Sequence, residues 1–291
     1  MRTAFSILLF ISTVGMAALP AAEKPGPPHV VAVETRDYKV EFAGDRAWTI
    51  FRILFKGTLV GDKNGFYGTV LIPDGGKFVG TGHTEGGVER VESVTLTVDG
   101  KPADLKDKTV YRASRVELRK KSMMGPLRLE ATYVVGDDCL LERHCYEAPE
   151  DTMIHLLYAF MHCWLPSTTE WIAEKADSTV VDGKFDSSGN FKLRADVKWT
   201  ALYDPENRKA MLAWFPKVLA GQGHRTTYWD KAVYHKLYTQ LLSGATLPRG
   251  TRFEAALVIR GVETAPDDWK HAVKTAAEET QRQFARGKIR F

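Results

Sequence analysis

Residues 155–164 carry the side chains best suited to chemistry. If this segment is a strand, alternate residues share a face, so Tyr158, His162 and Trp164 project together. A phenol, an imidazole and an indole in one row suit stacking on a sugar ring and exchanging protons with it. The competing interpretation is that these amphipathic side chains belong to the core or its rim. We therefore treat His162 and Tyr158 as candidate catalytic residues and Trp164 as a candidate stacking residue.

A second strand-like segment, residues 140–148, precedes the first along the chain. It places His144 and Tyr146 on one face and Arg143 on the other. A hairpin through residues 148–151 would make the two segments neighbours and add His144 to the titratable group. Arg143 suits either the binding of a substrate carboxylate or a structural ion pair.

A glycine-rich loop, GTGHTEGG, occupies residues 80–87 and contains His83 and Glu85. Its glycines permit unusual backbone angles and close approach of a ligand. The loop lacks the Lys-Ser/Thr ending of a nucleotide P-loop, and no helical pattern follows it. The loop is thus either a ligand-contacting loop or a solvated hairpin, and not a nucleotide site.

The segment GHRTTYWDKAVYHKLYTQ, residues 223–240, mixes aromatic rings with charged tips, as a carbohydrate groove does. Its candidate residues are Arg225, Trp229, Tyr234 and His235. The chain has 40 basic and 36 acidic residues and a formal net charge of +4. With this near balance and no nucleic-acid motif, we expect no nucleic-acid partner.

The histidines and cysteines show no spacing typical of metal or haem ligands, so we predict no metal and no cofactor. Cys139, Cys145 and Cys163 are compatible with one disulfide, between the latter two, or with three free thiols. No G-x-S-x-G elbow of a serine hydrolase is present.

The elements that must position these residues are mostly strands. Short segments rich in β-branched and aromatic residues alternate in polarity and are separated by turn signals at Asp99-Gly100, residues 136–138 and residues 204–207. The run Arg119-Lys120-Lys121 is interpreted as a solvated turn. Residues 267–286 have acidic residues first, basic residues last and Gly287 just beyond, which predicts a terminal helix. The fold class expected is all-β, a large antiparallel sandwich with a C-terminal helix.

The amino end predicts export. Residues 1–22 combine Arg2, a short apolar run and small residues before Glu23, as a signal peptide does. Residues 23–28 form a Pro-rich linker, and residues 29–291 are expected to be one sandwich domain. The mature chain is then secreted or periplasmic, with no later membrane span.

Three segments carry a resemblance to a known family: GTGHTEGG at 80–87, LLYAFMHCW at 156–164 and WDKAVYHKLY at 229–238. Together with the strand pattern, they resemble the galactose-mutarotase-like supersandwich of aldose epimerases and of domains of several polysaccharide lyases. The resemblance implies a saccharide or polysaccharide partner.

The leading functional hypothesis is a polysaccharide lyase, in which a base removes the proton beside a uronate carboxylate and an acid protonates the leaving oxygen. His162 and Tyr158 are the predicted acid and base. Arg143 or Arg225 would bind the carboxylate, and Trp164 or Trp229 would stack on the ring. The alternatives are an aldose epimerase and a non-catalytic glycan-binding sandwich.

Overall fold

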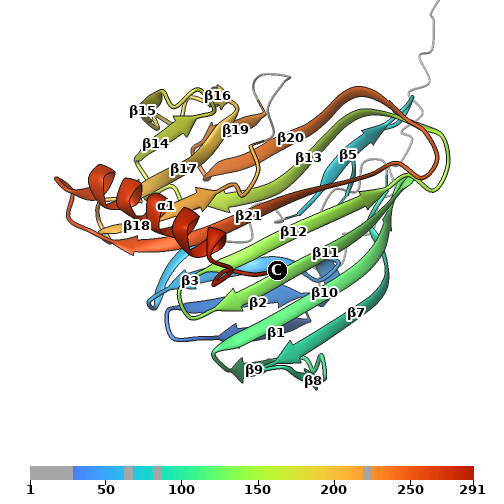
Figure 1. The fold of residues 1–291 in the computed structure, drawn as a ribbon, viewed down its shortest axis with the longest axis horizontal. Helices are drawn as coiled ribbons and strands as arrows, with labels where there is room; N and C mark the ends of the chain where they lie inside the picture. Colours follow the sequence, from blue (N-terminus) through green and yellow to red (C-terminus); the bar gives the residue numbers. More distant parts are fainter. Residues whose placement is uncertain (1–28, 62–67, 81–86, 219–224) are drawn as a thin grey trace, which may run out of the picture.

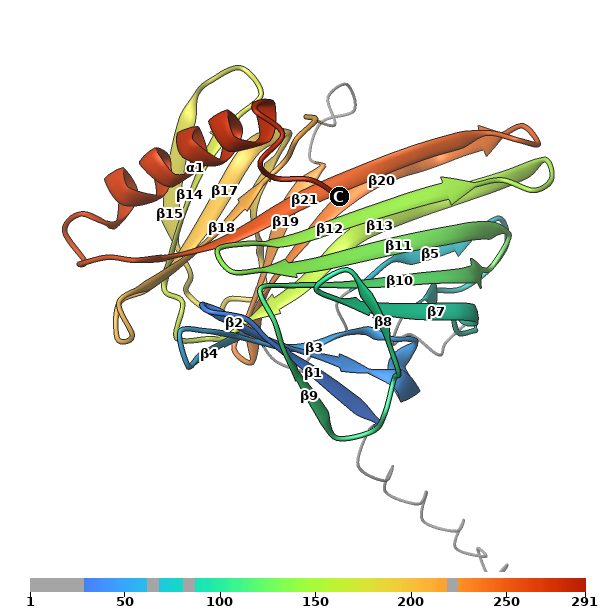
Figure 2. The same cartoon turned by 60° about the horizontal axis from the view of Figure 1, so that its bottom comes forward.

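The computed structural model describes residues 29–61, 68–80, 87–218 and 225–291. The predicted signal peptide and linker lie outside the described residues, as do His83 and Glu85 of the glycine-rich loop. The described chain forms two large β-sheets and one long helix (Figures 1 and 2).

Sheet A has eleven strands. They are β1 (Val30–Glu34), β2 (Tyr38–Ala43), β3 (Thr49–Phe55), β4 (Thr58–Gly61), β5 (Val70–Pro73), β6 (Val79–Gly80), β9 (Thr109–Arg112), β13 (Thr152–Trp164), β16 (Phe191–Ala195), β19 (Thr226–Lys231) and β20 (Tyr234–Leu247). Their spatial order is β16–β19–β20–β13–β4–β3–β2–β1–β9, and β5 joins beside β13 with β6 next to it. A short 3-10 helix, Gly44–Arg46, connects β2 to β3.

Sheet B has ten strands. They are β7 (Arg90–Val98), β8 (Lys101–Ala103), β10 (Arg115–Met124), β11 (Leu127–Gly136), β12 (Leu140–Glu147), β14 (Glu170–Lys175), β15 (Val180–Lys184), β17 (Val197–Asp204), β18 (Lys209–Trp214) and β21 (Arg252–Glu263). Their spatial order is β15–β14–β17–β18–β21–β12–β11–β10–β7–β8. The strands of this sheet pair antiparallel throughout the described chain.

The inner faces of the two sheets enclose the main core. Branched aliphatic and aromatic side chains from both sheets form one buried cluster, for example Val40 and Ile53 of sheet A with Leu118 and Leu257 of sheet B. Fully burying each such side chain contributes roughly 1.5–3 kcal/mol. The helix α1 (Trp269–Ala285) lies on the outer face of sheet B over β17, β18 and β21 (Figure 1), where Trp269 and Val273 join a second buried cluster.

The turn signals correctly predicted three hairpins. Asp99 and Gly100 both have positive φ, 46° and 78°, and join β7 to β8. A two-residue turn with positive φ at both positions matches the twist of antiparallel strands. The turns at residues 136–138 and 204–207 likewise join β11 to β12 and β17 to β18. The predicted all-β class and the terminal helix are also confirmed.

The predicted hairpin between the segments at residues 140–148 and 155–164 is wrong. The first segment is β12 of sheet B, between β11 and β21, whereas the second is β13 of sheet A. Residues 148–151 carry the chain from one sheet to the other. Turn residues mark where the chain reverses, but they do not specify which strand becomes the neighbour, because pairing depends on distant segments.

The solvated turn predicted at residues 119–121 is also wrong, because this run lies inside β10. Lys120 is 1% exposed, and its Nζ lies 2.8 Å from Glu89 Oε1 inside the sandwich. Ser122 donates to the same carboxylate at 2.6 Å. Alternation along the strand turns Lys120 inward between its two exposed neighbours.

All three cysteines are free thiols. Cys145 lies on β12 of sheet B and Cys163 on β13 of sheet A, so the disulfide left open from the sequence is not formed. Within the described residues, no helix is long and apolar enough to cross a membrane.

Candidate functional sites

A cluster of polar side chains lies between the sheets, and we call it the interior histidine cluster: Thr69, Glu142, His144, Tyr146 and His162. His162 Nε2 of β13 lies 2.7 Å from Glu142 Oε1 of β12. The other carboxylate oxygen of Glu142 lies 3.8 Å from His144 Nε2. The sequence correctly grouped His144 with His162, but the two histidines meet across the core rather than within one sheet.

The remaining contacts of the cluster hold His144 on its other side. Thr69 Oγ1 lies 3.1 Å from His144 Nδ1 and 2.7 Å from the hydroxyl of Tyr146. Burial lowers the pKa of His144 to about 4, against a smaller opposing effect of the Glu142 charge. Burial also raises the pKa of Tyr146 well above its usual value. His144 is therefore a neutral imidazole near neutral pH. Because burial in the folded protein lowers its pKa, its protonation opposes folding.

The expectation that Tyr158, His162 and Trp164 share one face is wrong. Between Ala159 and His162 the register of β13 against β20 shifts, and Phe160 adopts a positive φ of 55°. This β-bulge changes which residues face inward. His162 and Trp164 are buried, with their rings edge-on at 5.8 Å, whereas Tyr158 lies edge-on to Tyr238 at 4.7 Å on the outer face. The catalytic roles given to Tyr158 and His162 stay predictions.

The outer face of sheet A carries a continuous chain of aromatic rings, which we call the aromatic face: Tyr158, Phe191, Trp229, Tyr234 and Tyr238. Along this chain the ring centroids are 4.7 Å apart from Tyr158 to Tyr238 and 6.4 Å from Tyr238 to Phe191. The next steps are 6.0 Å from Phe191 to Trp229 and 6.4 Å from Trp229 to Tyr234. The rings come from β16, β19, β20 and β13, which are consecutive in the sheet.

The register explains why these rings converge. Phe191, Trp229 and Lys236 are directly opposite one another on β16, β19 and β20, so they form one row across three strands. Tyr238 follows Lys236 two residues along β20 and therefore shares its face, while Leu237 between them is buried in the core. The pairing of distant strands thus joins residues that are far apart in the sequence.

Cations are interleaved with the rings of the aromatic face. Lys231 Nζ lies 4.4 Å from the ring centroid of Trp229, and Lys236 Nζ lies 5.0 Å from that of Tyr234. The guanidinium of Arg194 lies 5.6 Å from the ring of Phe191. Phe191 itself is 46% exposed. The arrangement offers a partly exposed apolar platform with positive charges beside it.

Two other residues predicted from the segment at 223–240, His235 and Arg225, have partners within the protein. His235 points inward, 2% exposed, with its Nδ1 3.1 Å from Asp230 Oδ1 and its ring stacked on Phe185 at 3.9 Å. Burial lowers the pKa of His235. The guanidinium of Arg225 donates to the carbonyl of Leu241 at 2.9 Å. Trp229 and Tyr234, by contrast, belong to the aromatic face, and their role in substrate binding stays a prediction.

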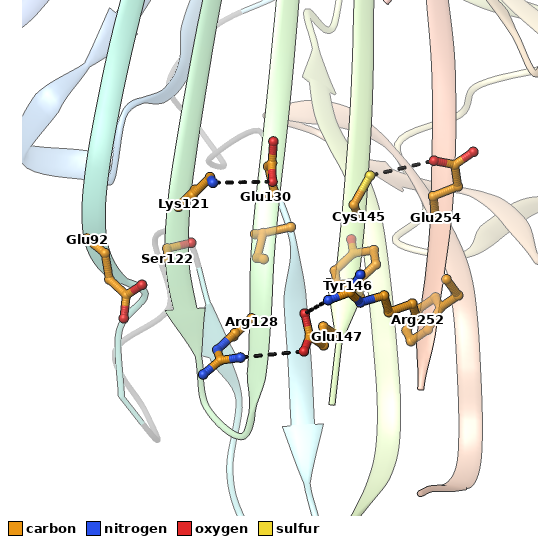
Figure 3. Close-up of a pocket in the computed structure, with 12 residues that line it drawn as sticks. Glu92, Lys121, Ser122, Arg128, Glu130, Cys145, Tyr146, Glu147, Arg252 and Glu254 are labelled. Atoms are coloured by element: carbon orange, nitrogen blue, oxygen red, sulfur yellow. Dashed lines mark hydrogen bonds and ion pairs between the residues drawn. The ribbon is translucent and has the colours of Figure 1, made fainter. Parts of the chain in front are cut away.

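A third candidate is a groove on the outer face of sheet B, shown in Figure 3 and called the charged groove. Its cavity volume is about 620 Å³. Its charged and thiol-bearing side chains are Glu92, Lys121, Arg128, Glu130, Cys145, Glu147, Arg252 and Glu254. Arg143 lies on the same face of β12, with its guanidinium 5.9 Å from the ring of Phe291.

Reasoning from the sequence did not identify the groove residues as candidates. Charged residues do alternate along the strands there, as at Arg128 and Glu130, but such alternation is typical of any solvated sheet face. No group of three or more His, Cys, Asp or Glu residues in the described chain is arranged to hold a metal ion.

Comparison with known proteins identifies the class of fold. No protein-family model matches the sequence, and no curated protein matches it. Among solved structures, the chain is similar to the Slr1438 protein from Synechocystis sp. PCC 6803, with a TM-score of 0.50 and 11% identity over 84% of this chain and 99% of that one. It is also similar to the galactosidase domain of an α-galactosidase–sucrose kinase, with a TM-score of 0.51 and 9% identity over 80% of this chain and 40% of that one.

A putative aldose 1-epimerase from Escherichia coli K12 matches with a TM-score of 0.46 and 10% identity, over 80% of this chain and 99% of that one. At such identities the likeness is one of fold alone. The chain is therefore similar in fold to the Slr1438 protein and to that galactosidase domain.

Proposed function

We propose that the protein binds a saccharide chain on the aromatic face. The observation that carries the proposal is the unbroken chain of five rings from Tyr158 to Tyr234, with centroid steps of 4.7–6.4 Å. Pyranose rings present apolar C–H faces that stack on aromatic side chains, while their hydroxyls bond to polar groups nearby. A solvated sheet face has no packing need for such a chain of rings.

The charges beside the rings favour an acidic saccharide. Lys231, Lys236 and Arg194 lie within 6 Å of the rings of Trp229, Tyr234 and Phe191. A uronate or sulfated unit stacked on a ring would meet a cation at its edge. Export, predicted from residues 1–22, belongs to the same proposal, because acidic polysaccharides are found outside the cytoplasm.

Replacing Trp229 with alanine is expected to weaken saccharide binding by roughly 10- to 100-fold, since a stacked aromatic anchor contributes on the order of 1–3 kcal/mol. The measurement is isothermal titration with acidic oligosaccharides such as oligouronates. Tyr111→Ala is the matched control, because Tyr111 is a half-buried aromatic residue of β9, far across sheet A. Equal weakening in both variants, or none in Trp229→Ala, would contradict the proposal.

A second candidate function is β-elimination from a uronate polymer on the same face. Two phenols, Tyr158 and Tyr238, lie against each other, and the positive charge of Arg194 acts on both. Burial raises the pKa of Tyr158, while the Arg194 charge opposes this shift. Arg194 is placed to neutralise a uronate carboxylate, and a phenol is suited to exchange a proton with the adjacent carbon or the leaving oxygen. An epimerase needs an enclosed pocket, whereas Phe191 of the aromatic face is 46% exposed, so an epimerase is the less favoured alternative.

If the chain is a lyase, it will generate new ultraviolet absorbance from the unsaturated product when incubated with a uronate polymer. Tyr158→Phe, which keeps the ring, is expected to lower this rate by at least roughly 100-fold with little change in binding. The assay is repeated with several uronate polymers. If the protein binds them but none gives new absorbance, the lyase hypothesis is rejected and glycan binding is the remaining function.

A further inference from the structure

The charged groove consists of two rows of side chains with opposite net charge. In the first row Arg128, Glu147 and Arg252 are directly opposite one another on β11, β12 and β21. Both arginines contact the same carboxylate, at 3.5 Å from Arg128 and 3.0 Å from Arg252. Two cations therefore share one anion, and this row has an excess positive charge.

The second row is anionic. Glu130, Cys145 and Glu254 are directly opposite one another on the same three strands. Burial raises the pKa of the Cys145 thiol, which stays protonated and lies 3.6 Å from Glu254 Oε2. Lys121 is 3.9 Å from Glu130, so one cation faces two carboxylates. In Figure 3 the second row, with Glu130, Cys145 and Glu254, lies above the first row along the strands.

The rows are separated by a distance that the strand geometry fixes. Each row is displaced from the other by two residues along every strand, which corresponds to ~7 Å. The β7 edge of the groove is irregular, because the register of β7 against β10 shifts at Lys121 and Ser122 and leaves Glu92 as an extra residue. Such β-bulges redirect a side chain, and Glu92 lines the cavity.

The side chains of the rows remain available for a ligand. The side chains of Arg252 and Arg128 are 75% and 59% exposed. Exposed ion pairs contribute little, roughly 0–1 kcal/mol, so a ligand carboxylate can replace or extend them at small cost. An arginine carries five N–H donors, and Glu147 uses few of them.

We propose that the charged groove binds a small zwitterion, with the acidic group of the ligand on Arg128 and Arg252 and its ammonium group on Glu130 and Glu254. The ligand class includes amino acids with a distal amino group and saccharide units carrying both an amine and an acid. The site is on sheet B and is independent of saccharide binding at the aromatic face of sheet A.

The test uses the full chain and three probes of equal length. 5-Aminopentanoate carries both charges at about one row spacing, ~7 Å. Pentanoate lacks the ammonium and pentylamine lacks the carboxylate. Titrations are followed by amide chemical shifts, and 5-aminopentanoate is expected to bind at least roughly tenfold more tightly than either control, with shifts at residues of both rows.

Two variants separate the rows. Arg252→Gln and Glu254→Gln are each expected to weaken 5-aminopentanoate binding about tenfold, and to do so through opposite ends of the ligand. Arg252→Gln should leave pentylamine binding unchanged, and Glu254→Gln should leave pentanoate binding unchanged. Asp182→Asn removes a comparable exposed ion pair, with Lys270, outside the groove and is the control. Equal binding of all three probes, no saturable binding, or no effect of either variant overturns the proposal.

Discussion

Replacing Glu142 with alanine is expected to lower the free energy of unfolding by about 1–3 kcal/mol, because it removes the carboxyl partner of a buried imidazole. The side chains of Glu142 and His162 are both 0% exposed and lie 2.7 Å apart. They belong to different sheets, so the pair also joins the two layers. Without the Glu142 side chain, the His162 imidazole loses this 2.7 Å contact in a buried site.

His162→Ala is expected to have a similar effect, because it leaves the buried carboxyl group of Glu142 without that contact and removes ring volume from the core. The measurement is denaturant unfolding of both single variants and the double variant. A coupling of 1 kcal/mol or more between the two substitutions is expected for groups in direct contact, within the roughly 0.5–3 kcal/mol found for such pairs.

The matched control is Asp182→Ala, which breaks the ion pair with Lys270 at 2.9 Å. Both of these side chains are more than 40% exposed, so this change is expected to cost no more than about 1 kcal/mol. The same experiment decides the role of His162. If His162→Ala melts within a few degrees of the unmodified chain but loses turnover of a saccharide, His162 is catalytic and the structural role is rejected.

The second large effect is a loss of stability in acid that depends on His144. Its pKa is about 4 in the folded protein, against an ordinary value of 6.5. The unfolded chain therefore binds a proton near pH 6.5 that the folded chain accepts only near pH 4. The contribution of neutral His144 is fully present above pH 6.5 and is lost as the pH falls toward 4. The total is on the order of 3 kcal/mol.

His144→Gln isolates this effect, since an amide can still bond to Thr69 but does not titrate. The free energy of unfolding is measured for the unmodified chain and for His144→Gln between pH 7 and pH 4. The difference between the two curves of free energy against pH gives the contribution of His144. The charged groups that act on His144 are Glu142, Glu89, Lys120 and His162, and they are the same in both proteins. The curve of the variant should fall less steeply below pH 6.5. Parallel curves would mean that His144 does not control the acid transition.

Local signals in the sequence determined the strands, the three hairpins and the terminal helix. Asp99-Gly100 supplies two residues that tolerate positive φ, and this requirement is local to the turn. The period-two pattern likewise predicted a strand over residues 155–164, which lies within β13. The polarity of charges around residues 267–286 predicted a helix that runs from Trp269 to Ala285.

The partly correct grouping of the site residues has a similar explanation. Strand alternation placed His144 and Tyr146 on one face of β12, and both do point into the sandwich. The aromatic residues Trp229 and Tyr234 were chosen by type, because rings beside charges are typical of saccharide sites, and the structure brings both onto the aromatic face.

Only the tertiary structure decided which of these side chains meet. The bulge at Phe160 separates Tyr158 from His162, and it arises where β13 must fit the register of β20. The assignment of β12 to sheet B puts His144 opposite His162 across the core, and it depends on pairing with β21, more than a hundred residues later. The charged groove and the aromatic face are likewise formed by strands that are remote from one another in the sequence. Pairing and register follow from contacts between distant segments, which no local pattern encodes.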